Sequence, residues 1–121
     1  MASPDDEVMV IEDEPEARTH LVELLQLEGF KATAYANGAE ALAELQRRTK
    51  LPCLIVLDIR MPVMDGPQFR AALLADARLS AIPVVVMTGF DPSAAAKLSV
   101  LRVFRKPLDF DALLTAVRAN C

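Results

Sequence analysis

The sequence alternates five times between a short apolar run and a segment with helical character, and this alternation limits the fold most. The apolar runs cover residues 8–13, 31–35, 53–58, 82–88 and 100–105. Runs of this length, rich in β-branched residues, are typical of strands buried on both faces. Strands that alternate with helices predict a parallel sheet covered by helices on both faces. A barrel would need eight such units, so an open five-stranded sheet is expected.

Residues that favour helix ends mark the segments between these runs. Gly29 is a plausible stop for the first helix, and Asn37 is a good N-cap for the second. The third helix follows Gly66, and Asp91 followed by proline is typical of the opening of a short fourth helix. The last helix begins near Asp109, where apolar residues recur at i, i+3, i+4 and i+7.

Length and charge narrow the class of protein. With 121 residues the chain is expected to form one domain, structured over about residues 6–119, with no output domain. The net charge of −4 argues against direct binding to nucleic acid, and Arg47, Arg48 and Lys50 resemble the solvated end of a helix. No apolar run approaches the roughly 20 residues of a membrane span. The N-terminus lacks signal-peptide features, so a cytoplasmic protein without a membrane partner is expected.

The two cysteines do not indicate a disulfide framework. Cys53 opens a predicted buried strand, and Cys121 is the last residue of the sequence. Reduced thiols are therefore the expectation for both.

Acidic residues follow two of the predicted strands. In a doubly wound sheet of order 2-1-3-4-5, strands 1 and 3 are neighbours, which would bring Glu12, Asp13 and Asp58 to one edge. Two carboxylates about 5 Å apart repel by roughly 3 kcal/mol at an effective dielectric of 20. Such a cluster persists when a cation occupies it or when one acid is protonated. Hard oxygen ligands with open positions suit Mg²⁺.

A hydroxyl and an ammonium complete this edge. Thr88 ends the predicted fourth strand, and Lys106 follows the fifth. A carboxylate such as Asp58 beside a bound cation is a reasonable nucleophile toward a phosphoryl group. The metal and the lysine would neutralise charge on the transferring oxygens. Gly66 permits the tight turn into the third helix, and Asp65 is expected to act as a turn residue and helix cap.

The ordered set of motifs is similar to response regulator receiver domains and covers essentially the whole chain. Single motifs are weak, but five in the right order at strand ends are specific. The motifs are Glu12-Asp13, Asp58, Met61-Pro62-Val63-Met64-Asp65-Gly66, Thr88-Gly89 and Lys106-Pro107. The resemblance implies a flavodoxin-like (βα)5 fold, with Pro62 and Pro107 as turn residues.

The resemblance also assigns roles at the acidic edge. It implies that Asp58 is the phosphoacceptor and that Mg²⁺, or Mn²⁺, is held by Asp13, Asp58, Glu12 and the backbone carbonyl of Arg60. Thr88 and Lys106 would hold the phosphoryl oxygens. These three assignments come from the family pattern, residue by residue.

The same resemblance implies a signalling role rather than an enzyme acting on outside substrates. The phosphate donor would be a histidine kinase or a phosphotransfer protein, and a downstream protein target would read the phosphorylated state. The chain would act as a monomer or weak dimer. At most it would catalyse its own phosphorylation and dephosphorylation.

The chain departs from the family pattern near its fifth strand. The family usually has an aromatic residue three positions before the lysine, where this chain has Val103, and Phe104 follows. Side chains alternate faces along a strand, so Phe104 should not substitute for it. Thr88 and Lys106 are only 18 positions apart (106 − 88), which predicts a truncated or irregular fourth helix. Phe90 and Arg60 border the site and are expected to tune water access.

The sequence also bears on three other functions. A pseudo-receiver that serves as an interaction scaffold is favoured by the short fourth segment and Val103 and opposed by the intact acidic set. A phosphohydrolase of the haloacid dehalogenase type would need an Asp-x-Asp motif, whereas the first strand is followed by Asp13-Glu14-Pro15. No glycine-rich loop for a nucleotide follows that strand either. The single histidine, His20, is expected to be a solvated helix residue.

Overall fold

All five strands lie in one parallel sheet. The computed structural model describes residues 6–59, 64–89 and 100–121. The strands are arranged in the order β2-β1-β3-β4-β5, which confirms the predicted doubly wound topology. They are β1 (Glu7–Ile11), β2 (Lys31–Tyr35), β3 (Leu54–Asp58), β4 (Val84–Thr88) and β5 (Arg102–Arg105).

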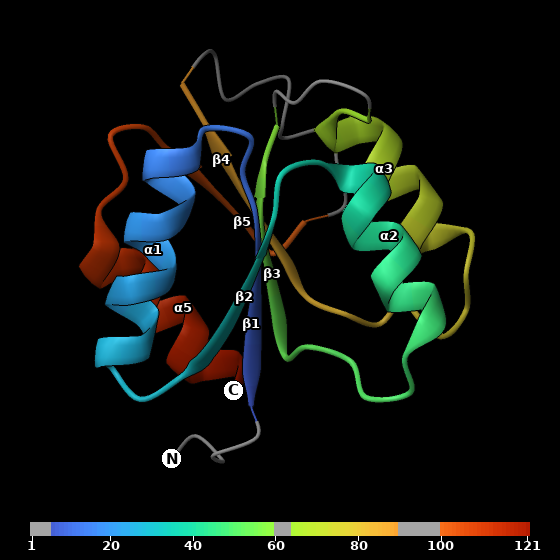
Figure 1. Cartoon of the computed structure of the whole chain (residues 1–121), viewed down its shortest axis with the longest axis horizontal. Coiled ribbons are helices and arrows are strands. Elements are labelled where there is room, and N and C mark those ends of the chain that lie inside the picture. The colour runs from blue at the N-terminus through green and yellow to red at the C-terminus, as the bar shows by residue number, and fades with distance from the viewer. Residues whose placement is uncertain (1–5, 60–63, 90–99) are drawn as a thin grey trace.

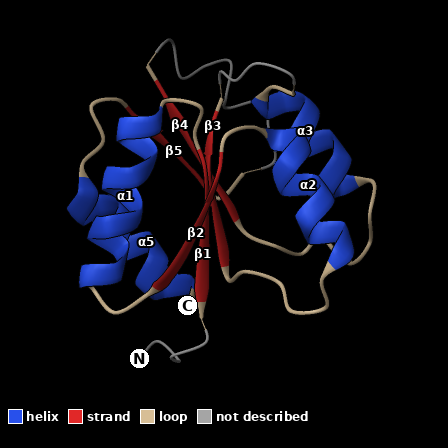
Figure 2. Cartoon of the chain, viewed as in Figure 1, coloured by secondary structure: helices blue, strands red, loops and turns tan. Residues whose placement is uncertain are grey.

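Helices cover both faces of the sheet. α1 (Pro15–Leu27) and α5 (Phe110–Asn120) lie on one face, and α2 (Gly38–Arg47) and α3 (Gly66–Leu74) lie on the other (Figures 1 and 2). The fourth helix predicted over residues 91–99 lies outside the described residues. Among the described helices, none has both the length and the apolar character needed to cross a membrane.

Predicted end signals are used where the helices begin and end. The Asn37 side chain accepts a hydrogen bond from the Glu40 amide at 2.9 Å and caps α2. Gly29 follows the α1 cap with φ of 92°, a left-handed conformation that glycine adopts without steric cost. The side chain of Asp109 accepts from the amide of Ala112 at the start of α5.

The strands differ in burial according to their place in the sheet. All residues of β1, β3 and β4 are buried, whereas β2 and β5 form the two edges and are partly exposed. The first strand was predicted over residues 8–13, but β1 ends earlier, at Ile11. Similarly, β4 begins at Val84, after Pro83, which has no amide hydrogen for a sheet ladder. Glu12 and Asp13 therefore lie in the loop that leaves β1.

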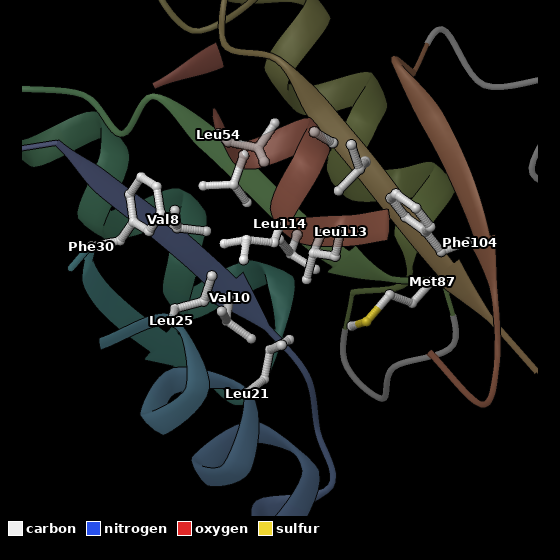
Figure 3. Packing of buried hydrophobic residues seen from close by; sticks show 14 residues of the cluster. Val8, Val10, Leu21, Leu25, Phe30, Leu54, Met87, Phe104, Leu113 and Leu114 are labelled. Carbon is white, nitrogen blue, oxygen red and sulfur yellow. The ribbon is translucent and has the colours of Figure 1, made fainter. Parts of the chain in front are cut away.

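The apolar core consists of two layers, one on each face of the sheet. The layer beneath α1 and α5 is seen in Figure 3, where side chains from β1, α1, β5 and α5 converge. Its labelled members include Val8, Val10, Leu21, Leu25, Phe104, Leu113 and Leu114. The second layer contains Phe69 and Leu73 of α3 with Ile55 and Leu57 of β3. These layers fix the strand ends that carry the polar residues.

One basic residue expected in a solvated helix end is instead part of a buried ion pair. Arg48 donates to both carboxylate oxygens of Glu7, at 2.5 and 2.8 Å. The Glu7 side chain is 5% exposed and also accepts a hydrogen bond from the Thr33 hydroxyl. Burial opposes ionisation of Glu7, but Arg48 and Thr33 outweigh it and hold its pKa below the usual value. The expectation for Arg48 was therefore wrong, because α2 ends directly beside the first residue of β1.

The expectation of reduced thiols was also wrong. Cys53 and Cys121 form a disulfide with a Cα–Cα distance of 5.4 Å, within the usual range for such a bridge. The physical reason is the return of α5 along the sheet, which brings its carboxyl end to the amino end of β3. The two cysteines are 68 residues apart in sequence, so local pattern gives no sign of this contact.

Candidate functional site

Three carboxylates converge where β1 and β3 end. Glu12, Asp13 and Asp58 each offer an oxygen atom within 4.8 Å of the others. Glu12 and Asp58 are buried, whereas Asp13 is exposed. The convergence follows from the parallel pairing of β1 with β3, in which Ile11 lies opposite Leu57. The two strands therefore end at the same edge of the sheet. The predicted convergence of these three residues is therefore observed.

Lys106 reaches into this cluster from the end of β5. Its Nζ lies 3.3 Å from Asp58 Oδ2 and 3.4 Å from Glu12 Oε2, so one ammonium bridges two carboxylates. β5 is positioned for this contact because the Lys106 amide donates to the carbonyl of Thr88 at 2.8 Å. The Lys106–Pro107 peptide bond is cis.

The buried charges alter one another's protonation. Burial raises the pKa of Glu12 to about 7, helped by the Asp58 charge and opposed by Lys106. For Lys106, burial lowers the pKa, but the charges of Asp58 and Glu12 outweigh burial and raise it overall. Burial and the Asp58 charge thus outweigh the single lysine, and both favour the protonated form of Glu12.

Arg18 and Glu14, two residues that no sequence motif indicated, hold the loop that carries Glu12 and Asp13. Arg18 Nη1 donates to the carbonyl of Glu12 at 2.9 Å and lies 3.4 Å from the carbonyl of Asp13. Glu14 caps α1, accepting from the amide of Ala17 at 2.7 Å. The proline after Glu14 is a recognisable signal for a helix start. By contrast, no sequence pattern indicates that the Arg18 side chain contacts the backbone of residues 12 and 13.

Thr88 occupies the end of β4 beside Asp58. In the pairing of β3 with β4, Asp58 lies opposite Met87, and Thr88 is the next residue with only 1% exposure. A shallow cleft of about 340 Å³ opens at this edge of the sheet. Its walls include Glu12, Asp13, Asp58 and Lys106. The cleft leaves room for a small group next to Asp58.

The turn from β3 into α3 requires a glycine. A Cβ atom on Gly66 would lie 2.9 Å from the Cα of Ile59, closer than real side chains approach backbone. The Gly66 amide also donates to the carbonyl of Ile59 at 3.0 Å. Asp65 and Gln68 form a reciprocal capping box at the start of α3. Asp65 is therefore a helix cap, and the predicted site residues Arg60 and Pro62 lie outside the described residues.

Val103 and Phe104 point to opposite faces of the sheet. Phe104 is buried in the core layer under α1 and α5, and the guanidinium of Arg102 lies 4.6 Å from its ring centre. Val103 packs against the other layer. The two side chains thus alternate between the core layers, as expected for neighbouring residues of a strand, and the role of Phe104 stays a prediction. Phe90, the other predicted tuning residue, lies outside the described residues, and His20 is exposed as expected.

The donor set fits a hard divalent cation. Three carboxylates supply only oxygen atoms, all close enough to contact one ion. Burial, and after it the charge of Asp58, raises the pKa of Glu12, and a cation held between these carboxylates would favour the ionised form. The exposure of Asp13 leaves one side open to solvent.

Comparison with known proteins identifies the family. The response regulator receiver domain family matches residues 8–118, so the chain belongs to this family and is a receiver domain of two-component signalling. It is 36% identical to the response regulator Rre1 of Synechocystis sp., aligned over 92% of this chain and 49% of that protein. It is 29% identical to the protein PilH of Pseudomonas aeruginosa, over 93% of this chain and 94% of that protein. The chain thus spans about half of the first relative and nearly all of the second.

Solved structures agree with this assignment. A response regulator receiver protein from Pseudomonas putida superposes with a TM-score of 0.87 at 26% identity, covering 98% of this chain and 99% of that chain. The response regulator TrrA of Thermotoga maritima, solved in complex with Mg²⁺-BeF, has a TM-score of 0.82 at 25% identity. The match covers 96% of this chain and 99% of TrrA.

Proposed function

We propose that this receiver domain accepts a phosphoryl group on Asp58 and signals through protein contacts. The observation that carries the proposal is the contact of Lys106 with both Asp58 and Glu12 inside the carboxylate cluster. Asp58 is the buried acid at the end of a central strand, with one oxygen on the lysine and the cleft beside it. A carboxylate held in this way is preorganised for attack on a phosphorus atom.

In the proposed reaction a carboxylate oxygen of Asp58 forms a bond to phosphorus while the bond to the donor's leaving group breaks. Lys106 neutralises part of the charge on the transferred phosphoryl oxygens, and the buried hydroxyl of Thr88 lies at the adjacent strand end to donate to them. Arg18 and Glu14 act indirectly, because they hold the loop on which Glu12 and Asp13 stand.

Glu12, Asp13 and Asp58 would hold Mg²⁺, together with the backbone carbonyl of Arg60. When bound, the ion would screen the negative charge that accumulates between the phosphoryl group and the carboxylates. The donor chemistry of the cluster supports this assignment, as does the complex of TrrA with Mg²⁺-BeF. Mn²⁺, which also accepts carboxylate oxygens, would serve in the same place.

Receiver domains take phosphate from histidine kinases, and we propose the same class of donor, or a phosphotransfer protein, for this chain. The chain would form a single domain that works in the cytoplasm as a monomer or weak dimer. It would not act on outside substrates. Its output would be a downstream protein that distinguishes the phosphorylated state.

The proposal is tested by incubating the protein with acetyl phosphate and Mg²⁺ and measuring its intact mass. One phosphoryl adduct is expected on the wild type and none on Asp58→Asn. Asp65→Asn is the matched control, because asparagine also caps helices and Asp65 lies in the α3 capping box. It should be labelled like the wild type. A folded wild type without an adduct, or an equal adduct on Asp58→Asn, would refute the assignment.

The position of Val103 bears on how the phosphorylated state is transmitted. We propose that coupling through this strand is weakened, because Phe104 belongs to the opposite core layer. Amide chemical shifts recorded with and without beryllofluoride and Mg²⁺ measure that coupling. Changes that stay near the carboxylate cluster are expected. Large changes throughout α5 and β5 would contradict the weakened coupling without affecting the assignment of Asp58.

A further inference from the structure

The bridge between Cys53 and Cys121 lies at the end of the sheet opposite to the carboxylate cluster. Cys53 immediately precedes β3, while Asp58 is the last residue of that strand. Five residues of extended chain, about 3.3 Å each, separate the two ends of β3. The thiol chemistry and the proposed phosphate chemistry are therefore spatially separate.

Both cysteines are held in place by contacts that do not require the bridge. The Cys53 amide donates to the carbonyl of Glu7 at 2.9 Å, and the Cys121 amide donates to the carbonyl of Val117 at 2.8 Å. In addition, Cys53 Sγ lies 3.2 Å from the carbonyl of Glu7, an acceptor for the thiol hydrogen when the bridge is open. The reduced pair would therefore remain in register for closure.

α5 is also secured by apolar packing that is independent of sulfur. Leu113, Leu114 and Val117 are buried in the core layer beneath this helix. This buried face would hold α5 on the sheet when the bridge is open. Both cysteines are partly exposed rather than buried, and access is one of the factors that set the rate of thiol–disulfide exchange.

We propose that Cys53 and Cys121 form a reversible thiol–disulfide site that exchanges with low-molecular-weight disulfides and is reopened by dithiols. One protein thiolate attacks a sulfur of a disulfide such as oxidised glutathione, giving a mixed disulfide and releasing one glutathione thiolate. The second protein thiolate then attacks the protein sulfur of the mixed disulfide and releases the second glutathione. Two electrons pass from the protein to glutathione, and the two thiol protons end on the two glutathione thiols.

Closure of the bridge should stabilise the folded state measurably. A cross-link between residues 68 positions apart restricts the unfolded chain and favours folding by about a thousandfold in the loop-closure treatment. For a domain of this size the thermal midpoint should rise by about 15 °C. The shift should vanish in Cys53→Ser and Cys121→Ser, each of which leaves a single thiol.

The proposal is tested by equilibrating the full chain in buffers of increasing oxidised-to-reduced glutathione ratio. Alkylation and intact-mass measurement should show a passage from two reactive thiols to none, with no glutathione retained. Thermal unfolding of the same samples should show the higher midpoint only for the closed form of the wild type.

Three results would overturn the proposal. The first is two reactive thiols, or a retained mixed disulfide, in fully oxidised glutathione. The second is a bridge that native-state dithiothreitol cannot open. The third is a midpoint shift that persists in either single-serine variant. None of these outcomes depends on phosphate transfer at Asp58.

Discussion

Replacement of Glu12 by glutamine should change the pH dependence of stability in the metal-free protein. Burial and the neighbouring Asp58 raise the Glu12 pKa from 4.5 to about 7. A carboxyl group whose pKa is raised in the folded state favours folding when it is protonated, and this contribution to the free energy of unfolding is complete below pH 4.5. That contribution is lost as pH rises through about 7, because the folded chain must then hold the unfavourable charge.

The size of the effect follows from the shift. The difference between the two pKa values corresponds to about 3 kcal/mol across the interval. Glutamine has no charge at any of these pH values and keeps an oxygen that accepts from the Glu14 amide, as Glu12 does at 3.3 Å. Glu12→Gln should therefore resemble the wild type at pH 5 and exceed its stability by about 3 kcal/mol at pH 8. The thermal midpoint at pH 8 should be higher by about 10 °C.

Thermal unfolding followed by circular dichroism in EDTA, from pH 5 to pH 8, measures this difference. Glu16→Gln is a suitable control, because Glu16 is an exposed acid in the first turn of α1. Addition of Mg²⁺ should stabilise the wild type more at pH 8 than at pH 5. A difference between Glu12→Gln and the wild type that is the same at both pH values would refute the electrostatic reasoning.

Three further substitutions test other parts of the fold. Arg48→Met should destabilise the protein at pH 7 by about 3–5 kcal/mol in urea unfolding, because Glu7 stays buried without its partner. The Glu7 pKa is lowered, so this loss of stability should shrink as pH falls below 4.5. The control Arg47→Met, at an exposed side chain, should change the free energy of unfolding little. Gly66→Ala should lower both the thermal midpoint and the extent of acetyl phosphate labelling, because its Cβ would lie 2.9 Å from the Cα of Ile59. An unchanged midpoint and unchanged labelling would contradict this prediction. Asp65→Ala should cost about 1 kcal/mol in urea unfolding through loss of the cap, and Asp65→Asn should restore it.

The sheet order and the carboxylate cluster were predictable because both follow from local signals and one topological rule. Short apolar runs mark the strands, and the carboxyl ends of parallel strands meet at one edge. That rule placed Glu12, Asp13, Asp58 and Lys106 together, and they are together. The exact end of β1 was not predictable, because an apolar run does not show where the ladder to the next strand stops.

Contacts between distant segments were not predictable from the sequence. The pairing of Arg48 with Glu7 depends on where α2 ends relative to β1, and the bridge between Cys53 and Cys121 depends on the return of α5. Arg18 was missed for a similar reason, since its target is backbone carbonyl and carries no side-chain signature. Periodicity describes which face of an element is buried, but it does not specify which polar groups meet across elements.

The bridge has a practical consequence for spectroscopy of this protein. The sequence contains two cysteines, and both are in the disulfide, so the oxidised chain has no thiol that reacts with maleimide reagents. A cysteine introduced at an exposed position such as Glu16 could then be labelled selectively without removing any native residue from the core. A fluorophore or spin label placed this way would report on the carboxylate end of the sheet while the native sulfur atoms stay occupied at the other end.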